Sequence, residues 1–167
     1  MKLSEPRTHD FLVIRYDRTG FLIDRDRCVG STFLAESRPL DKEAGYLAGR
    51  IDYGGRSILV FDFDRRLREV FDLTGGDPGT AAVLMTPGEA VRRRIRAAAD
   101  CADDCLALKL PGRTRVARLP LTELRLIPRS LRARLARAGL LGCRFLPGER
   151  IQFLIDVDRL VSQTDFS

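Results

Sequence analysis

Cys101 and Cys105 enclose Asp103 and Asp104, a spacing that could bring thiolates and carboxylates to one divalent cation. A zinc site needs four well-spaced ligands, however, and the only histidine of the chain, His9, lies in a polar segment far from this cluster. We therefore interpret the four cysteines of the chain as structural thiols, neither metal ligands nor disulfide partners.

Catalytic chemistry has little support in the sequence. A serine or cysteine nucleophile needs a positioned general base, and a single histidine leaves few ways to supply one. A cysteine-based activity would need a thiolate that nearby cations stabilise. Asp62 and Asp156 each follow an apolar run and resemble a pair of catalytic carboxylates, but both are better placed to cap a turn or a helix start. We predict a protein that is not an enzyme and that binds no cofactor.

Arginine dominates the charge of the chain, which has a formal net charge of +6 and a pI near 9.6. The arginines gather at 92–96 and 129–137, where no Phe or Tyr accompanies them, and aromatic residues make up only 7% of the chain. Nucleic-acid surfaces usually combine cations with aromatic stacking platforms or a groove-reading helix. The pattern favours solvated helix faces or an acidic protein partner, and a basic nucleic-acid-binding β-barrel protein is the alternative.

The chain has 167 residues, enough for one compact domain or for two small ones that share a core. It contains no run of about eighteen apolar residues, and its first residues lack the apolar segment of a signal peptide. We expect a cytoplasmic protein without membrane insertion.

The strongest structural signal is Gly54-Gly55, at which two β-rich runs within 45–63 meet. Glycine tolerates positive φ at both central positions, so this pair predicts a tight hairpin with a primed turn. Alternation and breakers predict further strands at 11–16, 21–24, 28–34, 81–85, 106–110, 113–119, 121–126, 140–146 and 150–160, and helical segments at 64–72, 87–102 and 128–138.

The two halves of the chain resemble each other in the way they end. Residues 59–65 and 154–160 both finish a hairpin with an apolar run, an aspartate and an arginine, and the breaker-rich stretch 73–80 divides the sequence between them. We predict one domain over 1–167 with two barrel subdomains, about 11–72 and 80–162, and with chain ends that cross between the barrels.

In their order and spacing, five segments resemble CheW-like domains, the coupling proteins of bacterial chemotaxis. The sequence Gly-Arg-Ile-Asp-Tyr-Gly-Gly at 49–55 takes the place of the family's Val-Ile-Asn-Leu-Arg-Gly, and 58–63 takes the place of its Pro-Val-x-Asp-Leu strand. Residues 116–120, Pro128 and 154–160 are similar to the family's later strand, proline and final segment. The resemblance covers almost the whole chain.

This resemblance implies an all-β fold with short helices, built as two intertwined five-stranded SH3-like β-barrels without an active site. It also implies a non-catalytic signalling adaptor that couples a chemoreceptor-like sensor to the regulatory domain of a CheA-type histidine kinase. The family's loop arginine is Gly54 here and its asparagine is Asp52, so a cation and an amide donor are missing where a chemoreceptor tip would couple. The helical stretch 87–102 resembles an insertion.

We place the partner-binding surface on the hairpin loop and its flanks. Tyr53 is the side chain expected to bury into a partner, and the competing interpretation is that it packs across its own hairpin. The predicted contact residues are Arg50, Asp52, Tyr53, Gly54, Gly55 and Arg56.

Overall fold

The computed structural model describes residues 6–34, 37–38, 45–74, 79–99, 104–112, 114–128, 130–131, 135, 138–148 and 150–164. The strands in these residues are β1 (Thr8–Arg15), β2 (Thr19–Asp24), β3 (Cys28–Phe33), β4 (Leu47–Tyr53), β5 (Arg56–Asp62), β6 (Ala81–Met85), β7 (Leu106–Lys109), β8 (Thr114–Pro120), β9 (Arg125–Leu126), β10 (Leu140–Leu146) and β11 (Arg150–Ile155). The α-helices are α1 (Phe63–Phe71), α2 (Glu89–Ala99) and α4 (Val157–Ser162), and the short 3₁₀ turns are η1 (Arg25–Arg27) and η3 (Leu121–Glu123). None of the described helices is both long enough and apolar enough to cross a lipid bilayer.

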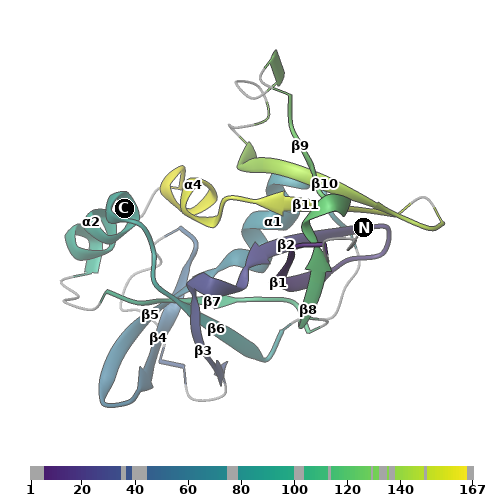
Figure 1. Cartoon of the computed structure of the whole chain (residues 1–167). Coiled ribbons are helices and arrows are strands. Elements are labelled where there is room, and N and C mark those ends of the chain that lie inside the picture. Colours follow the sequence, from purple (N-terminus) through teal and green to yellow (C-terminus); the bar gives the residue numbers. More distant parts are fainter. Residues whose placement is uncertain are drawn as a thin grey trace.

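The strands form two mixed sheets, one in the order β8-β1-β2-β11-β10-β9 and one in the order β3-β6-β7-β5-β4 (Figure 1). Each sheet contains one parallel pair, β2 with β11 or β5 with β7, and its other pairs are antiparallel. The predicted all-β class with short helices is confirmed. The first sheet has six strands where five were expected, because the two-residue β9 adds to its edge.

Each sheet takes strands from both halves of the chain. β1 and β2 lie with β8 to β11, whereas β6 and β7 lie with β3 to β5. The chain passes from one sheet to the other after β2 and again after β7. This exchange interlocks the two sheets.

Several strands consist of consecutive apolar residues because their side chains are buried on both faces of the sheet. Along β5, Leu59 and Phe61 belong to a large cluster shared by both sheets and α1, while Ile58 and Val60 belong to a smaller cluster on the opposite face. β1 shows the same alternation, because Leu12 points into the shared cluster and its two neighbours into a separate small one. A strand that is buried on both faces needs apolar residues at every position. The fold thus has a shared core between the sheets and a small core inside each sheet.

The hairpin between β4 and β5 has the predicted turn. Gly54 and Gly55 have φ values of 57° and 77°, and Tyr53 pairs with Arg56 across the turn. Positive φ at both central residues is the geometry of a type I′ turn, which matches the twist of the flanking strands. The prediction of a primed hairpin is confirmed.

Two aspartates begin helices, as predicted. The Asp62 carboxylate accepts a hydrogen bond from the Arg65 backbone N–H at 3.0 Å at the start of α1, and Asp156 accepts one from the Arg159 N–H at 3.1 Å at the start of α4. A carboxylate at this position satisfies a helix N–H that has no partner within the helix. The resemblance between residues 59–65 and 154–160 therefore reflects one repeated joint, a strand that ends in a capped helix.

Two strand predictions were wrong in their extent. The strand expected at 150–160 ends at Ile155, because the Asp156 cap begins α4. The strand expected at 121–126 is the turn η3 followed by β9, so only its last two residues pair with β10. Of the helix expected at 128–138, Ser130, Leu131 and Leu135 are helical, and residues 129, 132–134, 136 and 137 lie outside the described residues.

Candidate functional site

The predicted contact residues lie together at one end of the five-stranded sheet. We call residues 50–56, the ends of β4 and β5 with their turn, the hairpin tip. Arg38 forms an isolated bridge to Arg50, with backbone hydrogen bonds of 2.7 and 2.8 Å, and its guanidinium donates to the Asp52 carboxylate at 2.8 Å. One flank of the tip is therefore held by a neighbouring segment as well as by its own hairpin.

Tyr53 is 41% exposed, and its hydroxyl end lies against β3. A Cβ built on Gly30 would lie 2.9 Å from the Tyr53 hydroxyl oxygen, so the end of the Tyr53 side chain lies close against the β3 backbone at this glycine. β3 and β4 are opposite edges of their sheet, and this approach shows that the sheet curls until its edges meet. The ring offers one surface to the protein and another to solvent.

The structure places His9 beside two carboxylates that the sequence analysis did not connect with it. His9 Nε2 lies 2.8 Å from an Asp24 oxygen and 3.9 Å from an Asp26 oxygen, and the three possible ligand atoms all lie within 4.8 Å of one another. An imidazole and two carboxylates could hold a divalent cation, although three partly exposed donors are fewer than a structural zinc site uses. In the structure, His9 Nε2 forms a hydrogen bond with the Asp24 carboxylate.

This hydrogen bond predicts a pH dependence of stability. The bond to Asp24 raises the pKa of His9 above its ordinary value of 6.5. A raised folded-state pKa gives a stabilising contribution that is fully present below the unfolded-state pKa and is lost as the pH rises through the folded-state pKa. We expect the melting temperature of the wild type to exceed that of His9→Gln at about pH 5.5 and the difference to shrink at about pH 8.5. A difference that grows with pH would contradict this assignment.

The cysteines within the described residues agree with a structural role. Cys28 is buried, and burial raises the pKa of its thiol, which lowers its reactivity. Cys105 and Cys143 are partly buried. Cys101 and Asp103, which were weighed as metal ligands, lie outside the described residues.

Acidic groups of the same chain contact much of the basic run at 92–96. Arg92 and Arg93 lie 3.3 and 3.8 Å from the Glu89 carboxylate, and Arg96 donates to Asp104 at 2.6 Å. Pairs of this kind on an exposed helix contribute little stability. They do reduce the positive field that this helix offers to a phosphate backbone.

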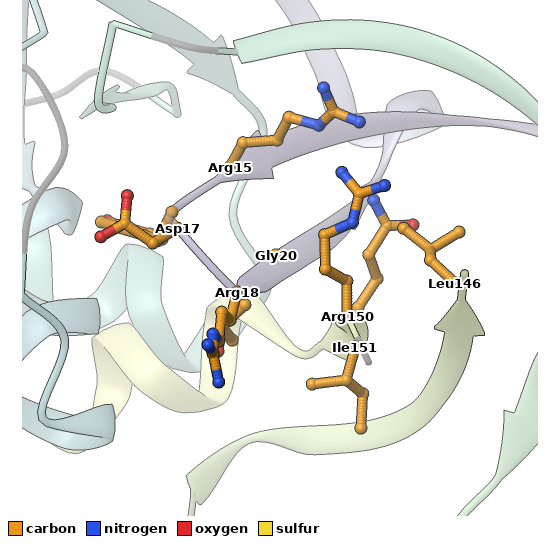
Figure 2. A pocket seen from close by; sticks show the side chains of 10 residues that line it. Arg15, Asp17, Arg18, Gly20, Leu146, Arg150 and Ile151 are labelled. Atoms are coloured by element: carbon orange, nitrogen blue, oxygen red, sulfur yellow. The ribbon is translucent and has the colours of Figure 1, made fainter. Parts of the chain in front are cut away.

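A pocket of about 260 Å³ lies between two turns of the six-stranded sheet (Figure 2). The sequence analysis did not identify it, because its walls come from both ends of the chain. The local sequence shows only that Arg15 precedes the turn at 17–20 and that Gly20 ends it. Its lining residues are Arg15, Tyr16, Asp17, Arg18, Thr19, Gly20, Leu146, Arg150, Ile151 and Gln152.

Comparison with known proteins finds similarity in structure and none in sequence. No family model and no curated protein sequence matches the chain. The crystal structure of the scaffolding protein TtCheW from Thermoanaerobacter tengcongensis superposes on it with a TM-score of 0.62, over 93% of this chain and 89% of that chain, at 11% sequence identity. The chain therefore has the fold of that scaffolding protein.

Proposed function

We propose that this protein is a non-catalytic scaffold of the chemotaxis type, which joins a CheA-type histidine kinase regulatory domain to a chemoreceptor-like sensor through protein-protein contacts. The observation that carries the proposal is the fold shared with a scaffolding protein over 93% of the chain. A body with a core between its two sheets keeps its surfaces in a fixed relation, as an adaptor with two partners requires.

The hairpin tip is the proposed contact with the kinase domain. Its type I′ turn is short and the two strands pair up to the turn, so little conformational entropy is lost when a partner binds. Tyr53 presents a half-exposed aromatic ring, a residue type enriched among those that dominate binding energy. On β3, Val29 and Phe33 are also exposed, at 58% and 76%.

The turn lacks the cation that CheW-like domains carry there for a chemoreceptor, so the tip is proposed for the kinase domain alone. Gly54 stands where CheW-like domains have an arginine, and within the described part of the chain no other residue comes within 4 Å of where its Cβ would be. The cations that flank the turn are Arg50 and Arg56, on the strands instead of at the turn itself.

Titration calorimetry of the full chain with a purified CheA-type regulatory domain tests the proposal. We expect Tyr53→Ala to weaken the complex by about tenfold or more, the effect of removing an aromatic residue from the centre of an interface. Phe145→Ala is the matched control, because Phe145 is another exposed aromatic, at 65% exposure on β10, outside the hairpin tip. Its affinity should equal that of the wild type.

Three results would count against parts of this proposal. Equal affinity of Tyr53→Ala and the wild type would move the interface away from the tip. Absence of binding by the wild type at about 100 μM would contradict the kinase partner itself. Binding to oligonucleotides that weakens steeply with salt would favour the nucleic-acid alternative.

A further inference from the structure

The arginine-lined pocket lies far from the hairpin tip. Figure 1 shows the β1–β2 and β10–β11 turns at one end of the molecule and the β4–β5 turn at the other. A ligand in the pocket would therefore leave the tip accessible, and the inference below does not depend on the proposed function.

A single row of paired residues across three strands builds the pocket. Arg15 pairs with Gly20, and Gly20 pairs in turn with Gln152, so all three positions share one face of the sheet. Gly20 has no side chain to fill the middle of this row, and a Cβ there would lie 3.1 Å from both Gln152 Cγ and the Ile14 carbonyl oxygen. Arg150, two residues before Gln152 on β11, faces the same way. The missing side chain leaves a hollow with a guanidinium group on two sides.

This hollow is the open end of the sheet's own small core. By the same alternation, Val13 and Leu22 share the face of Arg15 and Gly20, and both are buried in that core. The mouth of a curled sheet is a frequent location for small-molecule sites. The pocket thus lies beside this small apolar core and is lined mainly by polar residues.

The rim carries uncompensated positive charge within the described residues. Arg15, Arg18 and Arg150 form no ion pair there, and Arg150 Nε donates only to the Pro147 carbonyl oxygen, at 3.3 Å. In Figure 2, Arg15 and Arg150 extend toward the same side, whereas the Asp17 carboxylate points away from both. Two guanidinium groups directed to one space favour an anion, since each can donate two parallel hydrogen bonds to a carboxylate.

Gln152 supplies the second, independent observation. The residue is 5% exposed, and its Oε1 has no hydrogen-bond partner among the described residues. A buried acceptor without a donor destabilises a fold, so native proteins rarely keep one without a ligand or an ordered partner. The ligand that completes this site carries an N–H or O–H donor beside its negative charge.

We propose that the pocket binds the carboxylate of an acidic amino-acid unit, held by Arg15 and Arg150 while an adjacent N–H of the same unit donates to Gln152 Oε1. The volume of about 260 Å³ is smaller than most drug-sized sites and suits one residue rather than a long segment. The same chemistry is offered by an acidic side chain of a protein partner and by a free acidic amino acid.

Amide NMR titration of the full chain with N-acetyl-glutamate N-methylamide tests this site. We expect saturable shifts of the Gly20 amide and of the Gln152 side-chain amide, and an affinity at least about tenfold lower for N-acetyl-glutamine N-methylamide, which lacks the charge. Tighter binding of the blocked glutamate than of free glutamate assigns the ligand to a protein segment, and the reverse order assigns it to a small molecule. Absence of shifts at about 10 mM overturns the proposal.

Three variants separate binding from folding. Arg15→Gln together with Arg150→Gln should abolish the shifts, whereas Arg125→Gln, the same change at an exposed position on β9, should leave them unchanged. Gln152→Met removes the unpaired acceptor, so it should keep or raise the melting temperature while it weakens binding about tenfold. Full affinity in Gln152→Met or in the double arginine variant would contradict the assignment.

Discussion

Phe21→Ala is expected to lower the free energy of unfolding by about 3 to 5 kcal/mol, the range measured when a buried phenylalanine is truncated. Phe21 is fully buried in the shared core, and its ring centroid lies 5.8 Å from that of Tyr16, 4.9 Å from Phe71 and 6.3 Å from Phe153. These rings come from the β1–β2 turn, α1 and β11. One substitution therefore weakens the packing of the six-stranded sheet against α1, the helix that follows β5 of the other sheet.

Urea denaturation followed by far-UV circular dichroism measures this effect. A single transition that moves as a whole to lower urea would show that the two sheets unfold together through their shared core. Phe145→Ala, which truncates the same residue type at an exposed position, should change the free energy by less than about 0.5 kcal/mol. Two separate transitions, with only one shifted by Phe21→Ala, would contradict a shared core.

Asp64→Ala is expected to be the next most destabilising change, at about 2 to 4 kcal/mol. The Asp64 carboxylate accepts a hydrogen bond from the Tyr16 hydroxyl at 2.5 Å and from Arg68 Nε at 3.1 Å, and the Arg68 guanidinium lies 5.2 Å from the Tyr16 ring centroid. Side-chain exposures of 11% for Asp64 and 26% for Arg68 leave little solvent to replace these bonds. Removing the carboxylate takes away the acceptor of the buried Tyr16 hydroxyl and one hydrogen-bond partner of Arg68.

A double-mutant cycle with Tyr16→Phe measures the coupling in this network. Burial and the hydrogen bond to Asp64 raise the pKa of Tyr16, so its hydroxyl stays protonated and donates throughout the ordinary pH range. The double variant should therefore lose less than the sum of the two single variants. Glu69→Ala is the control on the same helix: its exposed ion pair with Arg65 should contribute less than about 1 kcal/mol. Additive losses in the cycle would show that the two groups do not interact.

The sequence predicted the local features because local rules fix them. Gly54 and Gly55 need no distant contact to favour a type I′ turn, and Asp62 and Asp156 cap helices through N–H groups three residues away. The extent of the strand at 150–160 was misjudged for a related reason, since apolar alternation continues through Val157 and Leu160, which pack into the shared core from a helix. Short apolar segments fit both the alternation of a strand and the spacing of a helix.

The hairpin tip could be predicted from the sequence because its residues follow one another along the chain. The residues from other segments that pack against the tip could not be predicted in this way. Nothing local places Arg38 against Asp52 or Gly30 under the Tyr53 ring. These contacts depend on how far the five-stranded sheet curls. That curvature results from packing over the whole sheet.

By itself, the sequence determined an all-β chain of hairpins with capped helices, because turn geometry, capping and alternation act over a few residues. Only the tertiary structure decided which strands share a sheet, since β2 lies parallel to β11 across more than half of the chain. That pairing brings Gly20 beside Gln152 and creates the pocket. Long-range pairing is selected by the burial of both faces of each strand at once, and no short segment of sequence contains that information.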